Sequence, residues 1–204
     1  IKPNKKAQQK LWKFKYIKLY HPLAVKRIIE WYKAFYSWKN PYTGLTIAED
    51  PANIYVAAVN EDSIFEAYFN NFVHLDAKNR LILEKQFQRY LIKKYGSFEV
   101  VLKDWKEDRD TKTNFEDLKL LTADELKSKS SQRKKDTIEF LLVLETTFYN
   151  RVKDVLRGLG YKGLFTGTNN WYGYGNLLSN AMVGDYIEVH GYFDHPRRVK
   201  RPIK

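Results

Sequence analysis

A six-residue apolar run constrains the fold of this chain more than any other feature. Residues 54–59 read Ile-Tyr-Val-Ala-Ala-Val and follow the turn-forming residues 50–53. The run has the length and the aromatic and β-branched content of a strand that is buried on both faces. A helical pattern begins almost directly after it, at Ile64. The run therefore predicts a parallel strand, with Asn60 and Glu61 at its C-terminal tip.

Helical patterns alternate with short strands along the rest of the chain. The residue Asp136 and a glutamate three positions later form the pattern of a capping box, and Gly160 is a typical helix stop. The expected helices span residues 22–36, 63–73, 77–95, 97–106, 136–159 and 176–183, and the further strands span 163–167 and 185–190. Alternation of this kind predicts an α/β fold with a parallel sheet.

The charge of the chain is concentrated at its two ends. Of 36 basic residues, seven lysines lie in residues 1–18 and five arginines and lysines in residues 197–204, where no acid occurs. The remaining 24 basic residues balance the 24 acidic ones. These basic ends are either solvated or form a phosphate-binding arm, and nucleic acid is not expected as a partner. The charged residues 107–135 predict an inserted, partly exposed loop with a short helix around 116–127.

Composition excludes several classes of site. The chain has no cysteine, so it holds no disulfide, thiolate metal site or cysteine nucleophile. No stretch approaches the ~18 apolar residues of a membrane span. We expect no cofactor and a single domain over residues 1–204. Localisation and oligomeric state stay open, because the chain begins with Ile1 and its natural N-terminus is expected to be missing.

Polar residues follow each of the three expected strands. The C-terminal ends of parallel strands meet at one edge of a sheet, where α/β enzymes build their sites. The candidates are Asn60 and Glu61 on the first strand, Thr166, Thr168, Asn169, Asn170 and Trp171 on the second, and His190, Tyr192, Asp194 and His195 on the third. A carboxylic acid at this position is a candidate general acid/base.

Each candidate also has a purely structural interpretation. Glu61 could be the first-turn acid that the dipole of the next helix favours, and His190 could be a core histidine with satisfied hydrogen bonds. Trp171 could lie in the core or stack on a sugar face. His190, Asp194 and His195 could ligate a metal, but three ligands this close at one strand end rarely reach one ion, so we expect no metal.

Four segments resemble cellulase-like glycoside hydrolases that retain anomeric configuration and fold as (β/α)8 TIM barrels. The segments are 40–44 (Asn-Pro-Tyr-Thr-Gly), 60–63 (Asn-Glu-Asp-Ser), 165–169 (Phe-Thr-Gly-Thr-Asn) and 190–196 (His-Gly-Tyr-Phe-Asp-His-Pro). They occur in the same order in that family, and the resemblance covers most of the chain. It implies a partial barrel from the helix before the fourth strand to the sixth strand, with a long helical insertion after the fourth.

The resemblance also implies roles for the strand-tip residues. Glu61 matches the general acid/base, and Asn60 matches the partner of the sugar 2-hydroxyl. His190 and Tyr192 match residues that line the catalytic centre. The subsite residues implied are Asn169, Trp171, Asp194 and His195, and residues 40–44 are implied to be structural.

The chain departs from the family in one respect that decides its activity. A retaining enzyme needs a second carboxylate as nucleophile, and the family carries it on the seventh strand. Glu188 does not replace it, because it precedes the strand tip by two residues. The expected function is therefore a glycoside hydrolase fragment that acts on a β-linked oligo- or polysaccharide and is inactive alone. The alternative is a non-catalytic module that binds carbohydrate or a polyanion.

Overall fold

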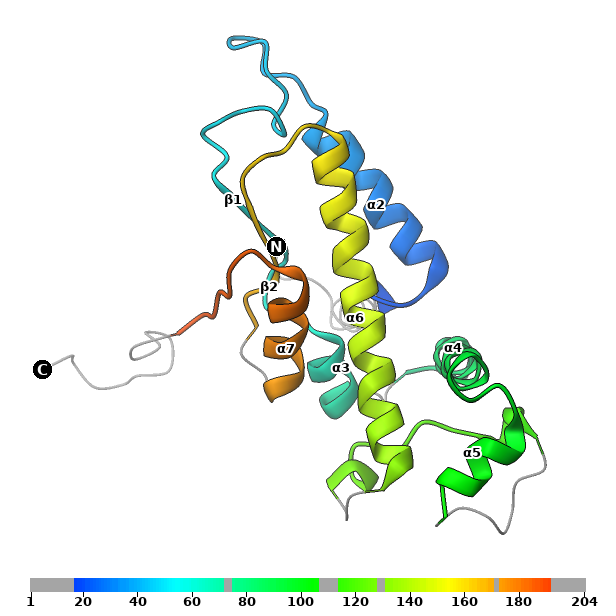
Figure 1. Cartoon of the computed structure of the whole chain (residues 1–204). Helices are drawn as coiled ribbons and strands as arrows, with labels where there is room; N and C mark the ends of the chain where they lie inside the picture. Colours follow the sequence, from blue (N-terminus) through cyan, green and yellow to red (C-terminus); the bar gives the residue numbers. More distant parts are fainter. Residues whose placement is uncertain (1–16, 72–74, 107–113, 128–130, 171–172, 192–204) are drawn as a thin grey trace, which may run out of the picture.

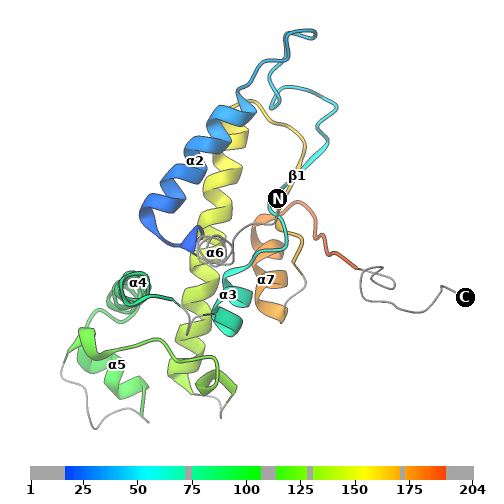
Figure 2. The same cartoon turned by 180° about the vertical axis from the view of Figure 1, so that it is seen from behind.

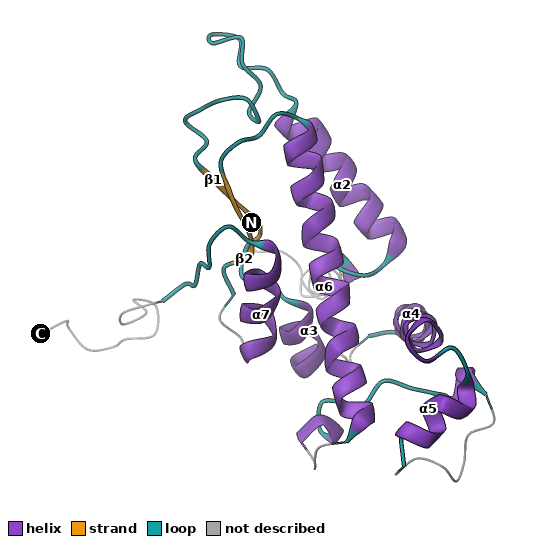
Figure 3. Cartoon of the chain, viewed as in Figure 1, coloured by secondary structure: helices purple, strands orange, loops and turns teal. Residues whose placement is uncertain are grey.

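A computed structural model of the chain describes residues 17–71, 75–106, 114–127, 131–170 and 173–191. Within them the chain forms helices and two short strands (Figure 1, Figure 3). In chain order the elements are α2 (Pro22–Tyr36), β1 (Tyr55–Val59), α3 (Ile64–Asn71), α4 (Ala77–Tyr95), α5 (Phe98–Asp104), the 3-10 helices η2 (Phe115–Asp117) and η3 (Glu125–Lys127), α6 (Gln132–Gly158), β2 (Leu164–Thr168) and α7 (Gly173–Val183). The expected α/β class with a parallel sheet is confirmed.

Helix α6 is the longest helix in the described structure, and most of the other elements pack against it. It has 27 residues and is therefore roughly 40 Å long. Figures 1 and 2 show it passing α2, α3, α4 and α7, and it contacts both strands. The strands pair in parallel, with Tyr55 opposite Leu164 and Val59 opposite Thr168. Both C-terminal tips therefore lie at the same edge of the sheet.

Local signals set most element ends as expected. Pro22 is at the start of α2, and the Nδ1 atom of His21 accepts from the Leu23 amide. Asp76 caps α4 by accepting from the Asn79 amide. The glycines Gly96 and Gly160 follow α4 and α6 with φ of 76° and 91°, a conformation that glycine adopts without a steric penalty.

The predicted start of the long helix at Asp136 is wrong. Helix α6 begins four residues earlier, and its N-cap is Ser131, whose hydroxyl accepts from the Lys134 amide. Asp136 is fully buried inside the helix. Its carboxylate accepts hydrogen bonds from distant side chains, namely Lys94, Tyr95 and Trp105. Tertiary partners, which a local pattern does not reveal, therefore use the oxygen atoms expected to cap the helix.

The predicted third strand at 185–190 is also wrong, although the segment runs beside β2. The Asp185 amide donates to Phe165 O at 2.7 Å, and the His190 amide donates to Asn169 O at 3.2 Å. From the first contact to the second, the chain advances four residues along β2 and the residue after it, from 165 to 169. Over the same distance the neighbouring segment advances five residues, from 185 to 190. A one-residue mismatch breaks the regular ladder, so the segment lies where a strand was expected without pairing as one.

The charged insertion is less exposed than its composition predicts. The single helix expected around 116–127 is replaced by η2 and η3 with an irregular stretch between them. Within the described residues 114–127, four leucines are buried and belong to the hydrophobic core despite the charge around them: Leu118, Leu120, Leu121 and Leu126. None of the described helices combines the length and apolar character needed to cross a lipid bilayer.

Candidate functional site

Glu61 occupies a constrained position at the tip of β1. Its φ is 51°, in the left-handed region that residues other than glycine rarely adopt, at a cost of about 1–2 kcal/mol. Two amide side chains beyond β2 hold this conformation. Asn169 Oδ1 accepts from the Glu61 amide at 2.6 Å, and Asn170 Nδ2 donates to the Glu61 carbonyl at 2.9 Å. The tip of β2 thus fixes the backbone of Glu61.

Asn169 joins three segments at this edge of the sheet. Besides the Glu61 contact, its Nδ2 donates to Asn60 Oδ1 at 3.1 Å, and its carbonyl accepts from the His190 amide. The residue is 5% exposed. Its amide oxygen and nitrogen both bind protein groups, which favours a positioning role over the predicted contact with substrate. Asn60 is exposed, and its own amide NH2 has no partner among the described residues, so it can donate to a ligand.

His190 contacts the carboxylate of Glu61 directly. Its Nδ1 lies 2.7 Å from Glu61 Oε1, and the two side chains are 31% and 32% exposed. An ionised carboxylate only accepts hydrogen bonds, so Nδ1 carries the proton when Glu61 is ionised. Glu188 Oε1 lies 3.8 Å from the opposite ring nitrogen. The pair therefore presents a partly exposed carboxyl group beside a fixed imidazole, an arrangement that can give up and recover a proton.

A second carboxyl group, Glu145 of α6, is buried beneath the tip of β1. Its Oε1 accepts from the Ile64 amide at 2.8 Å, and its Oε2 accepts from Ser179 Oγ at 2.6 Å. Burial raises the pKa of Glu145, and the hydrogen bonds from Ser179 and Ile64 oppose that rise. Glu145 thus connects the first residue of α3, three positions beyond Glu61, to helix α7.

Four predicted site residues lie outside the described residues: Trp171, Tyr192, Asp194 and His195. Of the other candidates, Asn60, Glu61 and Asn169 lie together at the C-terminal ends of β1 and β2, as expected from parallel strands, and His190 joins them from a segment that does not pair as a strand. Within the described ranges, no group of three or more His, Asp or Glu side chains is arranged to hold a metal ion. The basic ends also fall outside the described residues, apart from Ile17 and Lys18, and Lys18 pairs with Asp62 beside Glu61.

Two contributing residues, Glu145 and Asn176, were not among the strand-tip candidates. Asn170 was recognised as a polar strand-tip residue, but its Nδ2 also donates to Glu66 Oε2 at 2.7 Å. Asn176 Nδ2 donates in turn to the Asn170 carbonyl. The two consecutive asparagines at 169 and 170 indicated a polar strand tip in the sequence. Glu145 lies inside a helical pattern, and no neighbouring residue in the sequence indicates that it takes part in the site.

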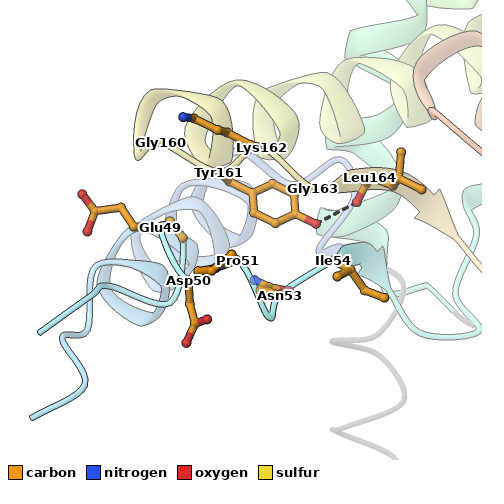
Figure 4. Close-up of a pocket in the computed structure, with 11 residues that line it drawn as sticks. Glu49, Asp50, Pro51, Asn53, Ile54, Gly160, Tyr161, Lys162, Gly163 and Leu164 are labelled. Carbon is orange, nitrogen blue, oxygen red and sulfur yellow. Dashed lines mark hydrogen bonds between the residues drawn. The ribbon is translucent and has the colours of Figure 1, made fainter. Parts of the chain in front are cut away.

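A hollow that is separate from the Glu61 site lies at the opposite end of the strands. It has a volume of about 650 Å³ and is lined by the residues that precede or begin β1 and β2. Figure 4 shows the charged ends of Glu49, Asp50 and Lys162 pointing in different directions. The Tyr161 hydroxyl is occupied by a hydrogen bond to Leu164 O at 2.8 Å. The charged groups therefore do not converge on one ligand atom.

Comparisons with protein-family models, with curated proteins and with solved structures found no significant match to this chain.

Proposed function

We propose that this chain is the middle part of the (β/α)8 barrel of a retaining glycoside hydrolase, with Glu61 as general acid/base. The observation that carries the proposal is the contact of 2.7 Å between Glu61 Oε1 and His190 Nδ1 at the C-terminal edge of a parallel sheet. Only the resemblance links this pair to sugar chemistry. The geometry supports it because Asn169 and His190 reach Glu61 from two other segments of the chain, and Asn169 also binds Asn60.

The proposed reaction has two steps. In the first, a carboxylate nucleophile bonds to the anomeric carbon while Glu61 gives its proton to the departing glycosidic oxygen. In the second, Glu61 takes a proton from water, whose oxygen displaces the nucleophile and releases the sugar with its original configuration. The free NH2 of Asn60 is proposed to donate to the 2-hydroxyl. The nucleophile is proposed to come from a later strand of the whole barrel, with its carboxyl group about 5–5.5 Å from that of Glu61.

The small size of the sheet in the described residues, where β1 pairs with β2 alone, supports the partial barrel. Parallel sheets are normally covered on both faces and contain more than two strands. Helix α2 packs beside β1, where the Tyr32 hydroxyl donates to Ala58 O. Three aromatic side chains in α2 and just after it are exposed: Trp31, Phe35 and Trp38, by 54%, 44% and 57%. An exposed aromatic patch of this kind is typical of a surface that another structural unit covers. A preceding strand and helix of the barrel would cover it.

The test uses the protein expressed with the sequence that flanks this chain, assayed on aryl β-glycosides with poor and good leaving groups. Glu61→Gln is expected to slow hydrolysis of the poor leaving groups about 10²- to 10⁴-fold, and that of activated ones far less in the first step. Glu49→Gln is the matched control, because Glu49 is exposed at the opposite end of the same strand. In Glu61→Ala, azide should restore turnover of an activated substrate and give a glycosyl azide.

The results separate this function from the alternative of a non-catalytic binding module. Near-normal turnover of poor leaving groups by Glu61→Gln would exclude Glu61 as acid/base. An inactive wild-type protein that still binds an oligosaccharide, with affinity insensitive to Glu61→Gln, would favour a carbohydrate-binding module. Binding to heparin that falls steeply with salt would favour the polyanion module.

A further inference from the structure

A second hollow of about 310 Å³ lies where three helices meet, on the other side of α6 from the sheet. It is lined by the start of α2 and the residues before it, by α4 and by α6. Figure 1 shows where these three helices lie in the fold. On α6 its lining residues are Leu144, Thr147, Phe148 and Arg151, which share one helix face by their spacing of three and four positions. The volume is at the small end of the range found for ligand sites.

The hollow carries uncompensated positive charge. Arg89 of α4 and Arg151 of α6 both line it, both are exposed, and no lining residue is acidic. Neither arginine side chain forms an ion pair or hydrogen bond with another residue in the part of the chain that the structure describes. A guanidinium group presents a planar fork of donors that matches a carboxylate or a phosphate. Two such groups at one hollow favour an oxyanion.

The rest of the lining is mainly apolar. Leu19, Val25 and Phe148 are at least 94% buried and form its inner part together with Leu144. The polar groups there are largely occupied, since Gln86 Nε2 already donates to Tyr20 O at 2.9 Å. A simple inorganic anion would leave this apolar surface in contact with water. An aromatic or aliphatic group attached to the anion would cover it.

We infer that this hollow binds a small amphiphilic oxyanion, a carboxylate or phosphate on an apolar stem, between Arg89 and Arg151. The head contacts the two guanidinium groups, and the stem lies against Leu144 and Phe148. The volume fits a compact molecule and not an extended polyanion, because roughly ten water-sized groups fill it. The site is independent of the proposed glycoside hydrolysis, since none of its lining residues contacts Glu61 or His190.

The experiment measures binding of phenyl phosphate and benzoate to the chain by isothermal titration calorimetry. Inorganic phosphate and phenol serve as the two halves of the first probe. Arg89→Gln and Arg151→Gln are each expected to weaken binding between about ten- and a hundredfold, as loss of a charged hydrogen bond does. Lys85→Gln removes the same charge from an exposed position of α4 outside the hollow, so it is expected to change affinity less than twofold.

Saturable binding of either aryl anion that both arginine variants weaken and Lys85→Gln does not would support the site. Circular dichroism of the variants checks that each retains the helical content of the wild type. Absence of saturable binding by the wild type, or equal weakening by Lys85→Gln, overturns the inference. Inorganic phosphate or phenol binding as tightly as phenyl phosphate also overturns it, and so does preferential binding of a heparin fragment.

Discussion

Replacing Glu145 with glutamine is expected to stabilise the protein relative to the wild type as the pH rises. The Glu145 carboxyl group is fully buried, and burial raises its pKa above the ordinary value of 4.5. The folded protein therefore keeps the Glu145 proton at pH values where the unfolded chain has released it. Glutamine has nearly the same shape and carries no ionisable proton, so it removes this difference between the two states.

The sign and the upper limit of the effect follow from proton linkage. Below about pH 4.5 the carboxyl group is protonated in both states, and pH has no effect through it. Between 4.5 and the raised pKa of the folded state, the folded protein binds more protons, so the free energy of unfolding falls as pH rises. One proton gives a slope of at most about 1.4 kcal/mol per pH unit. The unfolding free energy of the wild type should fall with pH through the titration of Glu145, and that of Glu145→Gln should lack this contribution.

The hydrogen bonds of Glu145 explain why glutamine is the informative substitution. A glutamine oxygen can still accept from the Ile64 amide, and its NH2 can donate to Ser179 Oγ. The Ser179 hydroxyl can then donate to Asn176 O, which lies 2.9 Å away. In Glu145→Leu, by contrast, the Ile64 amide loses its acceptor. That variant should therefore be about 1–3 kcal/mol less stable than Glu145→Gln at every pH, because neither variant carries the ionisable carboxyl group.

The assay is urea denaturation of the wild type and Glu145→Gln at pH 5, 6, 7 and 8. Asp154→Asn is the control, because Asp154 is an exposed acid on the same helix. The difference in unfolding free energy between Glu145→Gln and the wild type should grow with pH, while that of the control stays flat. A difference that stays constant from pH 5 to 8 would refute the reasoning.

Three further substitutions test the packing and the strand tip by the same denaturation assay. Asp136→Leu should cost about 3–5 kcal/mol, since Trp105 Nε1 and the Tyr95 hydroxyl lose their acceptor and Lys94 keeps only Glu139 of its two carboxylate partners; a loss under 1 kcal/mol would contradict this. Gly167→Ala should cost about 1–3 kcal/mol, because its Cβ would clash with the ring of Tyr149, whereas Gly158→Ala meets open space and should gain up to about 1 kcal/mol. Glu61→Gly should be about 1 kcal/mol more stable than Glu61→Ala, because only glycine relieves the left-handed backbone; equal stabilities would show that the residue carries no strain.

The sequence was most informative where short-range physics decides the outcome. Strand β1 begins and ends within one residue of the predicted 54–59, because turn residues precede it and polar residues follow. Helix α4 has the predicted bounds, because Asp76 caps its start and Gly96 ends it. The placement of Asn169 beside Glu61 also followed from a simple rule, that neighbouring parallel strands end at the same edge, whereas His190 reaches Glu61 from a segment that does not pair as a strand.

The predictions failed where a distant residue competes for a local group. Asp136 has the pattern of a helix cap, yet Trp105 Nε1 and Lys94 Nζ donate to its carboxylate, and the helix starts earlier. Residues 185–190 alternate like a strand, yet the Phe165 amide donates to the carboxylate of Asp185 at 3.0 Å. The contacts at the two ends of that segment differ by one residue in spacing, so no ladder forms between them.

By itself the sequence determined the alternation of elements and the identity of the polar residues at the strand tips, because both depend on periodicity and on chain direction. Only the tertiary structure decided what those residues contact. The Glu61 carboxylate meets His190, 129 positions away, and its backbone is held by two asparagines more than 100 positions away. Contacts over such separations depend on how helices and strands pack, and no local pattern in the chain encodes them.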